Sequence, residues 1–194
     1  MNENNGPVQV KKEPNVLTGD VMVFSTFSVF FCGNILGWFG DATLTIGVAQ
    51  VCLAGLFIIC AYQRGYYASF WGNMNLIFSF YFGILGGVTN ILMGAGVELN
   101  GLVLAVPNII AGVVLFGTLP GARHDPWTFF ILYLFAAIAV LGLGLGGVGI
   151  APGFLYPLAA WCLLGVGILG TYAVIANVNA CSGVNLPYGK PLFK

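Results

Sequence analysis

The sequence predicts an all-α, polytopic membrane protein, with six transmembrane helices in one bundle and both termini in the cytoplasm. Only 12 of its 194 residues, or 6%, carry a formal charge, and 59% are hydrophobic. A soluble domain has about 25% charged residues, so the composition excludes a soluble enzyme. The net charge is zero, which argues against a nucleic-acid partner. The charges are also clustered, and long apolar stretches separate them.

Six charge-free stretches are long enough to cross a bilayer. A helix rises about 1.5 Å per residue, so about 20 residues span a hydrocarbon core of roughly 30 Å. The expected spans are residues 21–39, 43–62, 67–94, 99–119, 127–149 and 154–176. We therefore expect a polar N-terminal segment over 1–20, a six-helix transmembrane domain over 21–179 and a cytoplasmic tail over 180–194.

Charged residues mark all but one of the span boundaries along the chain. Trp38 suits the headgroup region at the end of the first span, and Pro126 suits the first turn of the fifth. In chain order, the span boundaries are Asp20, Asp41, Arg64, Glu98, the trio Arg123–Asp125 and the uncharged segment Ile150–Gly153.

The basic residues predict the orientation. With six spans, all Lys and Arg residues fall on the side of the two termini, and the positive-inside rule places that side in the cytoplasm. The first 15 residues contain no apolar region typical of a cleavable signal peptide. We expect a multi-pass protein of a plasma or inner membrane, with an organelle membrane as the alternative. The basic residues are Lys11, Lys12, Arg64, Arg123, Lys190 and Lys194.

Glycines recur at helical spacing within several spans. Small residues four positions apart allow two helices to approach closely in lipid, and Gly83 and Gly87 of the third span have this spacing. The same holds for Gly142 and Gly146 of the fifth. Such stripes predict tight packing within the bundle, contact between protomers, or both.

A small set of uncharged polar side chains lies within the expected spans. Gln50, Asn73, Asn108 and Tyr81 offer hydrogen bonds without charge, which suits a narrow path for a small polar solute. Pro107 interrupts the helical hydrogen bonds beside Asn108. No Asp, Glu, Lys, Arg or His lies within any expected span, so we expect that no side chain in the membrane core exchanges a proton.

The sequence gives no indication of an enzyme, a metal site or a cofactor. His124 is the only histidine, and it lies in a loop between two charged residues, where a general base would need a pocket and an orienting partner. The five cysteines fall mostly within spans, which argues for free thiols. We expect no catalytic residues, no metal and no cofactor.

Three segments resemble the acetate uptake family, which includes the succinate-acetate channels. Phe-Gly-Thr-Leu-Pro-Gly-Ala-Arg over 116–123 resembles the family signature after the fourth span. Gly-Val-Ala-Gln over 47–50, with Ala54-Gly55 and Arg64-Gly65, is similar to its second span and basic loop. Asn185–Gly189 is a weaker similarity.

The resemblance implies a six-helix protomer that assembles as a homohexamer, each protomer with its own path for a small organic anion or its protonated acid. The family's constriction uses a Phe, a Tyr and a Leu. Counting from Arg123 places Leu132 at the Leu position, and counting from Gly65 places Leu76 at the Tyr position. Met22 or Phe24 takes the Phe position.

The sequence leaves three functions open. The leading one is a channel for a small monocarboxylate such as acetate, with a constriction formed by Leu132, Phe24 and Leu76. The second is a non-transporting accessory subunit that kept the fold and lost the pore; closure by Phe27, Phe30, Phe31 or by Phe78 and Phe80 would favour it. The third is a channel for a neutral solute such as ammonia, urea or water.

Overall fold

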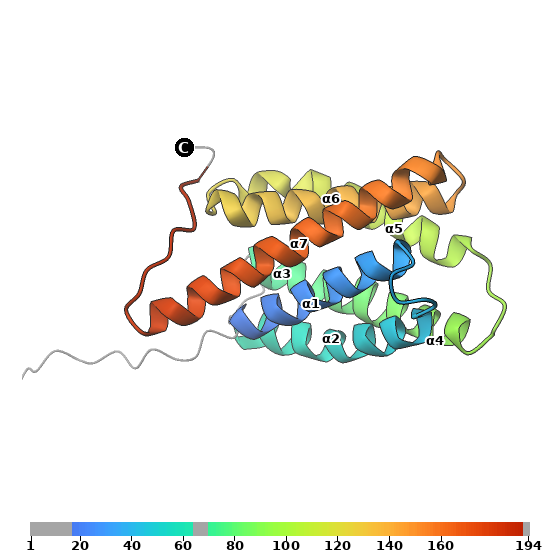
Figure 1. The fold of residues 1–194 in the computed structure, drawn as a ribbon, viewed down its shortest axis with the longest axis horizontal. Coiled ribbons are helices and arrows are strands. Elements are labelled where there is room, and N and C mark those ends of the chain that lie inside the picture. The colour runs from blue at the N-terminus through green and yellow to red at the C-terminus, as the bar shows by residue number, and fades with distance from the viewer. Residues whose placement is uncertain (1–16, 64–69, 192–194) are drawn as a thin grey trace, which may run out of the picture.

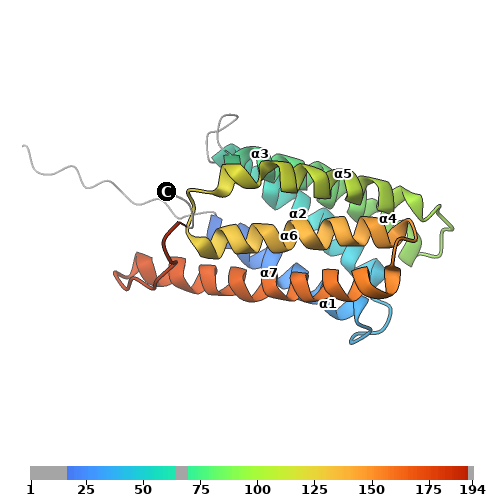
Figure 2. The same cartoon turned by 90° about the horizontal axis from the view of Figure 1, so that it is seen from above.

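The computed structural model describes residues 17–63 and 70–191 as a bundle of long helices (Figures 1 and 2). Six helical segments are long and apolar enough to cross a membrane, so the predicted fold class is confirmed and the chain is an integral multi-pass membrane protein. The elements are α1 (Leu17–Ile35), α2 (Thr43–Gln63), α3 (Phe70–Ile77), the π-helix η1 (Phe78–Gly86), α4 (Gly87–Gly94), α5 (Leu102–Thr118), the 3₁₀ turn η2 (Leu119–Ala122), α6 (Trp127–Gly147) and α7 (Pro152–Cys181).

Successive spans run in opposite directions (Figures 1 and 2), and α3, η1 and α4 together make the third span. Helices α1, α7, α6 and α5 pack in that order, while α2 lies along η1 and α4 and also contacts α1. The start of α1 and the end of α7 lie at the same end of the bundle (Figure 1). The loop between η2 and α6, which includes Arg123, is also at that end, whereas the loops before α2 and α5, which include Asp41 and Glu98, are at the other (Figure 2). The cytoplasmic orientation stays a prediction, because Lys11, Lys12, Arg64 and Lys194 lie outside the described residues.

Helix α1 begins earlier than expected, at Leu17, and this brings a carboxylate into the first span. The side chain of Asp20 is only 6% exposed. The expectation that no ionisable residue lies within a span is therefore wrong at Asp20. Its position in the first helical turn explains this, because the unpaired N–H groups there stabilise a negative charge.

The middle of the third span is a nine-residue π-helix, from Phe78 to Gly86. Two hydrogen bonds that involve side chains join it to α2. Ser79 Oγ donates to the Ala54 carbonyl at 3.1 Å, and Gln50 Nε2 donates to the Phe82 carbonyl at 3.1 Å. π-Helical turns are rare and occur frequently at functional sites, and the wider turn changes which side chains face the bundle centre.

Glycines allow α2 to approach the third span closely, which confirms the expected tight packing at Gly83 and Gly87. A Cβ on Gly83 would lie 2.5 Å from Ala54 Cβ, and one on Gly87 would lie 2.8 Å from Val51 Cγ2. From the other side, a Cβ on Gly47 would lie 2.5 Å from the backbone N of Ile91. Both helices therefore contribute glycines to one seam.

Substituting alanine into this seam tests its contribution. Gly47→Ala should destabilise the protein by about 1–3 kcal/mol, because backbone atoms opposite cannot move aside as a side chain can. Gly55→Ala is the matched control on α2, since a Cβ there meets nothing within 4 Å. It should be neutral or stabilise by up to about 1 kcal/mol. Thermal unfolding of the detergent-purified variants, followed by circular dichroism, measures both; equal stability of the two variants would contradict the seam.

Candidate solute passage

Two cavities follow one another through the centre of the bundle. The narrow cavity is about 50 Å³, and every one of the six spans contributes to its lining. The wide cavity is about 230 Å³ and lies toward the end of the bundle where α1 and α6 begin. Along the third span the residues that line the two cavities run from Trp71 to Asn90. This helical length is about 28 Å, close to the thickness of a hydrocarbon core.

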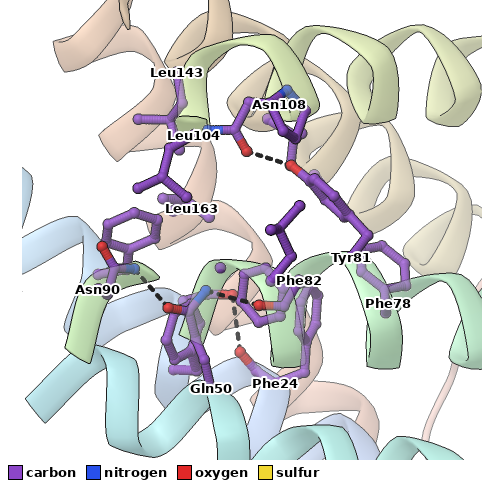
Figure 3. Close-up of a pocket in the computed structure, with 18 residues that line it drawn as sticks. Phe24, Gln50, Phe78, Tyr81, Phe82, Asn90, Leu104, Asn108, Leu143 and Leu163 are labelled. Carbon is purple, nitrogen blue, oxygen red and sulfur yellow. Dashed lines mark hydrogen bonds between the residues drawn. The ribbon is translucent and has the colours of Figure 1, made fainter. Parts of the chain in front are cut away.

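Four polar side chains of the narrow cavity form two hydrogen-bonded pairs (Figure 3). Asn90 Nδ2 donates to Gln50 Oε1 at 2.6 Å, while Gln50 Nε2 donates to the Phe82 carbonyl. The Tyr81 hydroxyl donates to Oδ1 of Asn108, which lies on α5. The eighteen residues that line this cavity include no Asp, Glu, Lys, Arg or His. Any selectivity there must therefore come from shape, aromatic walls and amide groups.

Phe24, Phe78 and Ala136 line both cavities and form the junction between them. The rings of Phe24 and Phe78 have centroids 5.7 Å apart at an interplanar angle of 54°. Phe57 packs against both rings at 6.1–6.3 Å. Aromatic rings at these distances attract one another, so the cluster forms a packed constriction between the two cavities.

The wide cavity is apolar with a polar end. Asp20 and Asp125 both line it, and Asp125 Oδ2 accepts a hydrogen bond from Trp71 Nε1 at 3.1 Å. Asn75 adds a buried amide. On the α6 wall, the Tyr133 hydroxyl donates to Met74 Sδ at 2.9 Å and lies 2.6 Å from Thr118 Oγ1.

The structure brings most of the sequence-predicted residues to this passage. Gln50, Tyr81 and Asn108 line the narrow cavity, Phe24 lines the junction, and Leu132 lines the wide cavity.

Asn73 and Leu76 line neither cavity: Asn73 is exposed and Leu76 is half-buried. The helical period explains this, because Trp71, Met74, Asn75 and Phe78 make up the inner face of α3 and leave positions 73 and 76 on the other side.

Sequence reasoning missed several residues of the passage. Asn75 and Asn90 are recognisable in the sequence as polar residues within a long apolar span, but nothing there distinguishes them from Asn73 as cavity-lining residues. Ala136 gives no chemical signal, since its importance lies in its small size at the junction. Phe57 is one of many phenylalanines, and only its ring contacts distinguish it.

The C-terminal tail is held against the start of α6 and the end of α7. Thr128 Oγ1 donates to the Tyr188 carbonyl at 2.6 Å, and the Tyr188 hydroxyl donates to Asn177 Oδ1 at 2.5 Å. The rings of Tyr188 and Phe129 stack with centroids 5.7 Å apart. Burial, with smaller contributions from Tyr172 and Cys181, raises the pKa of Tyr188. Since Phe129 also lines the wide cavity, the tail supports one of its walls.

Among the described residues, no group of three or more His, Cys, Asp or Glu side chains could hold a metal ion.

No protein-family model matches the chain, and no curated protein matches it significantly. The resemblance to the acetate uptake family therefore stays a prediction.

The pairing of Gln50 with Asn90 can be tested by a double-mutant cycle. Gln50→Leu and Asn90→Leu should each lower the stability by about 1–3 kcal/mol, because each leaves a buried amide without its partner. The double variant should be less destabilised than the sum of the two, since no unpaired amide remains. Chemical or thermal unfolding in detergent measures all three. If the losses of stability in the two single variants add up to the loss in the double variant, the two side chains do not interact energetically.

Proposed function

We propose that the protein is a membrane channel or transporter for small monocarboxylates such as acetate, with succinate as a further candidate, passive or proton-linked through the solute itself. The observation that carries the proposal is the pair of cavities at the bundle centre, which meet at Phe24, Phe78 and Ala136. A bundle packed only for stability has no need of a cavity that all six spans line.

The chemistry of the narrow cavity favours passage in the uncharged form. An ionised carboxylate loses its hydration there and meets no cationic side chain in the lining, which costs many kcal/mol. The protonated acid needs only hydrogen-bond partners, and Gln50, Tyr81 and Asn108 supply donors and acceptors in a largely aromatic and aliphatic wall. The proton then crosses with the solute and needs no relay of side chains.

The sequence resemblance supports the same solute class, because the similar segments belong to a family of acetate channels. It also supports a homohexamer as the assembly. The Gly-Val-Ala-Gln segment includes Gln50, which pairs with Asn90 in the narrow cavity, so the similar residues bear on the passage itself.

Two alternatives keep specific support. A channel for a neutral solute such as ammonia, urea or water is favoured by the uncharged polar lining. An accessory subunit without transport is favoured by the small size of the narrow cavity and by closure through Phe27, Phe31 and Phe78, all of which line it. Phe80 does not contribute to closure, since it is 60% exposed on the outer surface.

Filling the junction should abolish transport. Ala136 is 3% exposed and lines both cavities, so Ala136→Phe should reduce uptake of labelled acetate into proteoliposomes at least about tenfold, to the level of protein-free liposomes. Val113→Phe is the matched control, because Val113 is exposed on the outer face of α5. Thermal unfolding confirms that both variants fold; wild-type flux in folded Ala136→Phe would reject the passage.

The pH dependence distinguishes the solute forms. If the neutral acid crosses, protein-dependent flux at fixed total acetate should fall about tenfold per pH unit above pH 6, because the protonated fraction falls by that factor above a carboxyl pKa. Uptake of urea and methylammonium is measured in parallel. A flux independent of pH would indicate the anion, equal uptake of urea would favour the neutral-solute channel, and no uptake of any solute would favour the accessory subunit.

A further inference from the structure

The two cavities differ in size and in lining. The wide cavity is about 230 Å³ and the narrow one about 50 Å³. The walls of the wide cavity are mainly aromatic and aliphatic side chains from α1, α2, α3 and α6, such as Val21, Phe57 and Leu132. A solute that fits the wide cavity can therefore be too long for the narrow cavity.

One amide in the lining of the wide cavity lacks a hydrogen-bond acceptor. The side chain of Asn75 is 6% exposed, and its Nδ2 is buried with no hydrogen-bond partner among the described residues. Buried amide donors are nearly always satisfied in native proteins. Asn75 lies one helical turn before Phe78, so this group is placed at the approach to the junction.

We infer that the wide cavity binds monocarboxylic acids with a short apolar chain, from propionic to hexanoic acid, with the carboxyl group at Asn75 and the chain along the apolar walls. Acids too long for the narrow cavity bind there and block the passage of acetate. The blocking role rests on the proposed function, whereas the binding does not.

The ligand class follows from what Asn75 and the walls can offer. The amide nitrogen donates and needs an acceptor oxygen, which a carboxyl group has and an alkylammonium lacks. Each methylene buried against the apolar walls should raise the affinity about fourfold until the cavity is full. Asp20 and Asp125 also line this cavity, so binding is measured at pH 5, where a large share of the acid is uncharged.

The experiment measures binding by saturation-transfer NMR, with the full-length protein in lipid nanodiscs and empty nanodiscs as the background. Acetic, propionic, butyric and hexanoic acids form the chain-length series, and n-butylammonium is the comparison ligand. Affinity should rise with chain length, and Asn75→Leu should weaken it about tenfold at every length, through loss of the hydrogen bond. Asn73→Leu is the matched control, two residues away but on neither cavity, and it should bind as the wild type does.

Equal affinity of Asn75→Leu and the wild type, no gain with chain length, or tighter binding of n-butylammonium would each overturn the inference. Where Asn75→Leu does not fold, Asn75→Ala removes the same donor without added bulk, and the wild-type series decides in any case.

Acetate flux into proteoliposomes then separates the two proposals. Hexanoic acid should inhibit it at the concentrations at which it binds. If the protein transports acetate but hexanoic acid neither binds to it nor inhibits that transport, this inference is overturned and the proposed function stands. Binding that depends on Asn75 without any acetate flux supports the site and rejects transport.

Discussion

The contact between α2 and the third span is the constraint on which the passage depends. Glycines on both helices bring the backbones close enough for side chains of α2 to reach the π-helix, and Gln50 bonds both the Phe82 carbonyl and Asn90 across the seam. In a membrane core no water competes for these groups, so each must be satisfied within the protein. The seam therefore fixes the wall of the narrow cavity beside the aromatic cluster.

Composition was enough to predict the fold class and the number of spans, because burial in lipid imposes a length and an apolarity that no soluble fold requires. The polar set was partly predictable for the same reason: amides at membrane depth are rare, and Gln50, Tyr81 and Asn108 do line a cavity. The sequence could not tell Asn75 from Asn73, because the third span is apolar on all sides and shows no periodicity that marks its inner face. The position of Asp20 could not be predicted from its charge alone, because a charge usually marks the end of an apolar span, whereas the first turn of a helix also stabilises a carboxylate.

The distribution of polarity along the passage is uneven. Both carboxylates that line a cavity belong to the wide one, toward the predicted cytoplasmic end, and the narrow cavity holds only neutral groups. In the proposed transport, a solute would leave a cavity that contains carboxylates for one that contains only neutral groups. Because Phe24, Phe78 and Ala136 separate the two cavities, the proposal places the discrimination between charged and uncharged solutes at this single layer.

The π-helix has a consequence for any comparison of this chain with related sequences. Each i→i+5 hydrogen bond encloses one residue more than the i→i+4 bond of an α-helix. A relative whose third span is α-helical throughout would align with this chain on one side of Phe78–Gly86, but on the other side its register would be shifted. An alignment without gaps would then pair inward-facing side chains with outward-facing ones, and a true correspondence requires a gap inside a hydrophobic span, where alignments ordinarily place none.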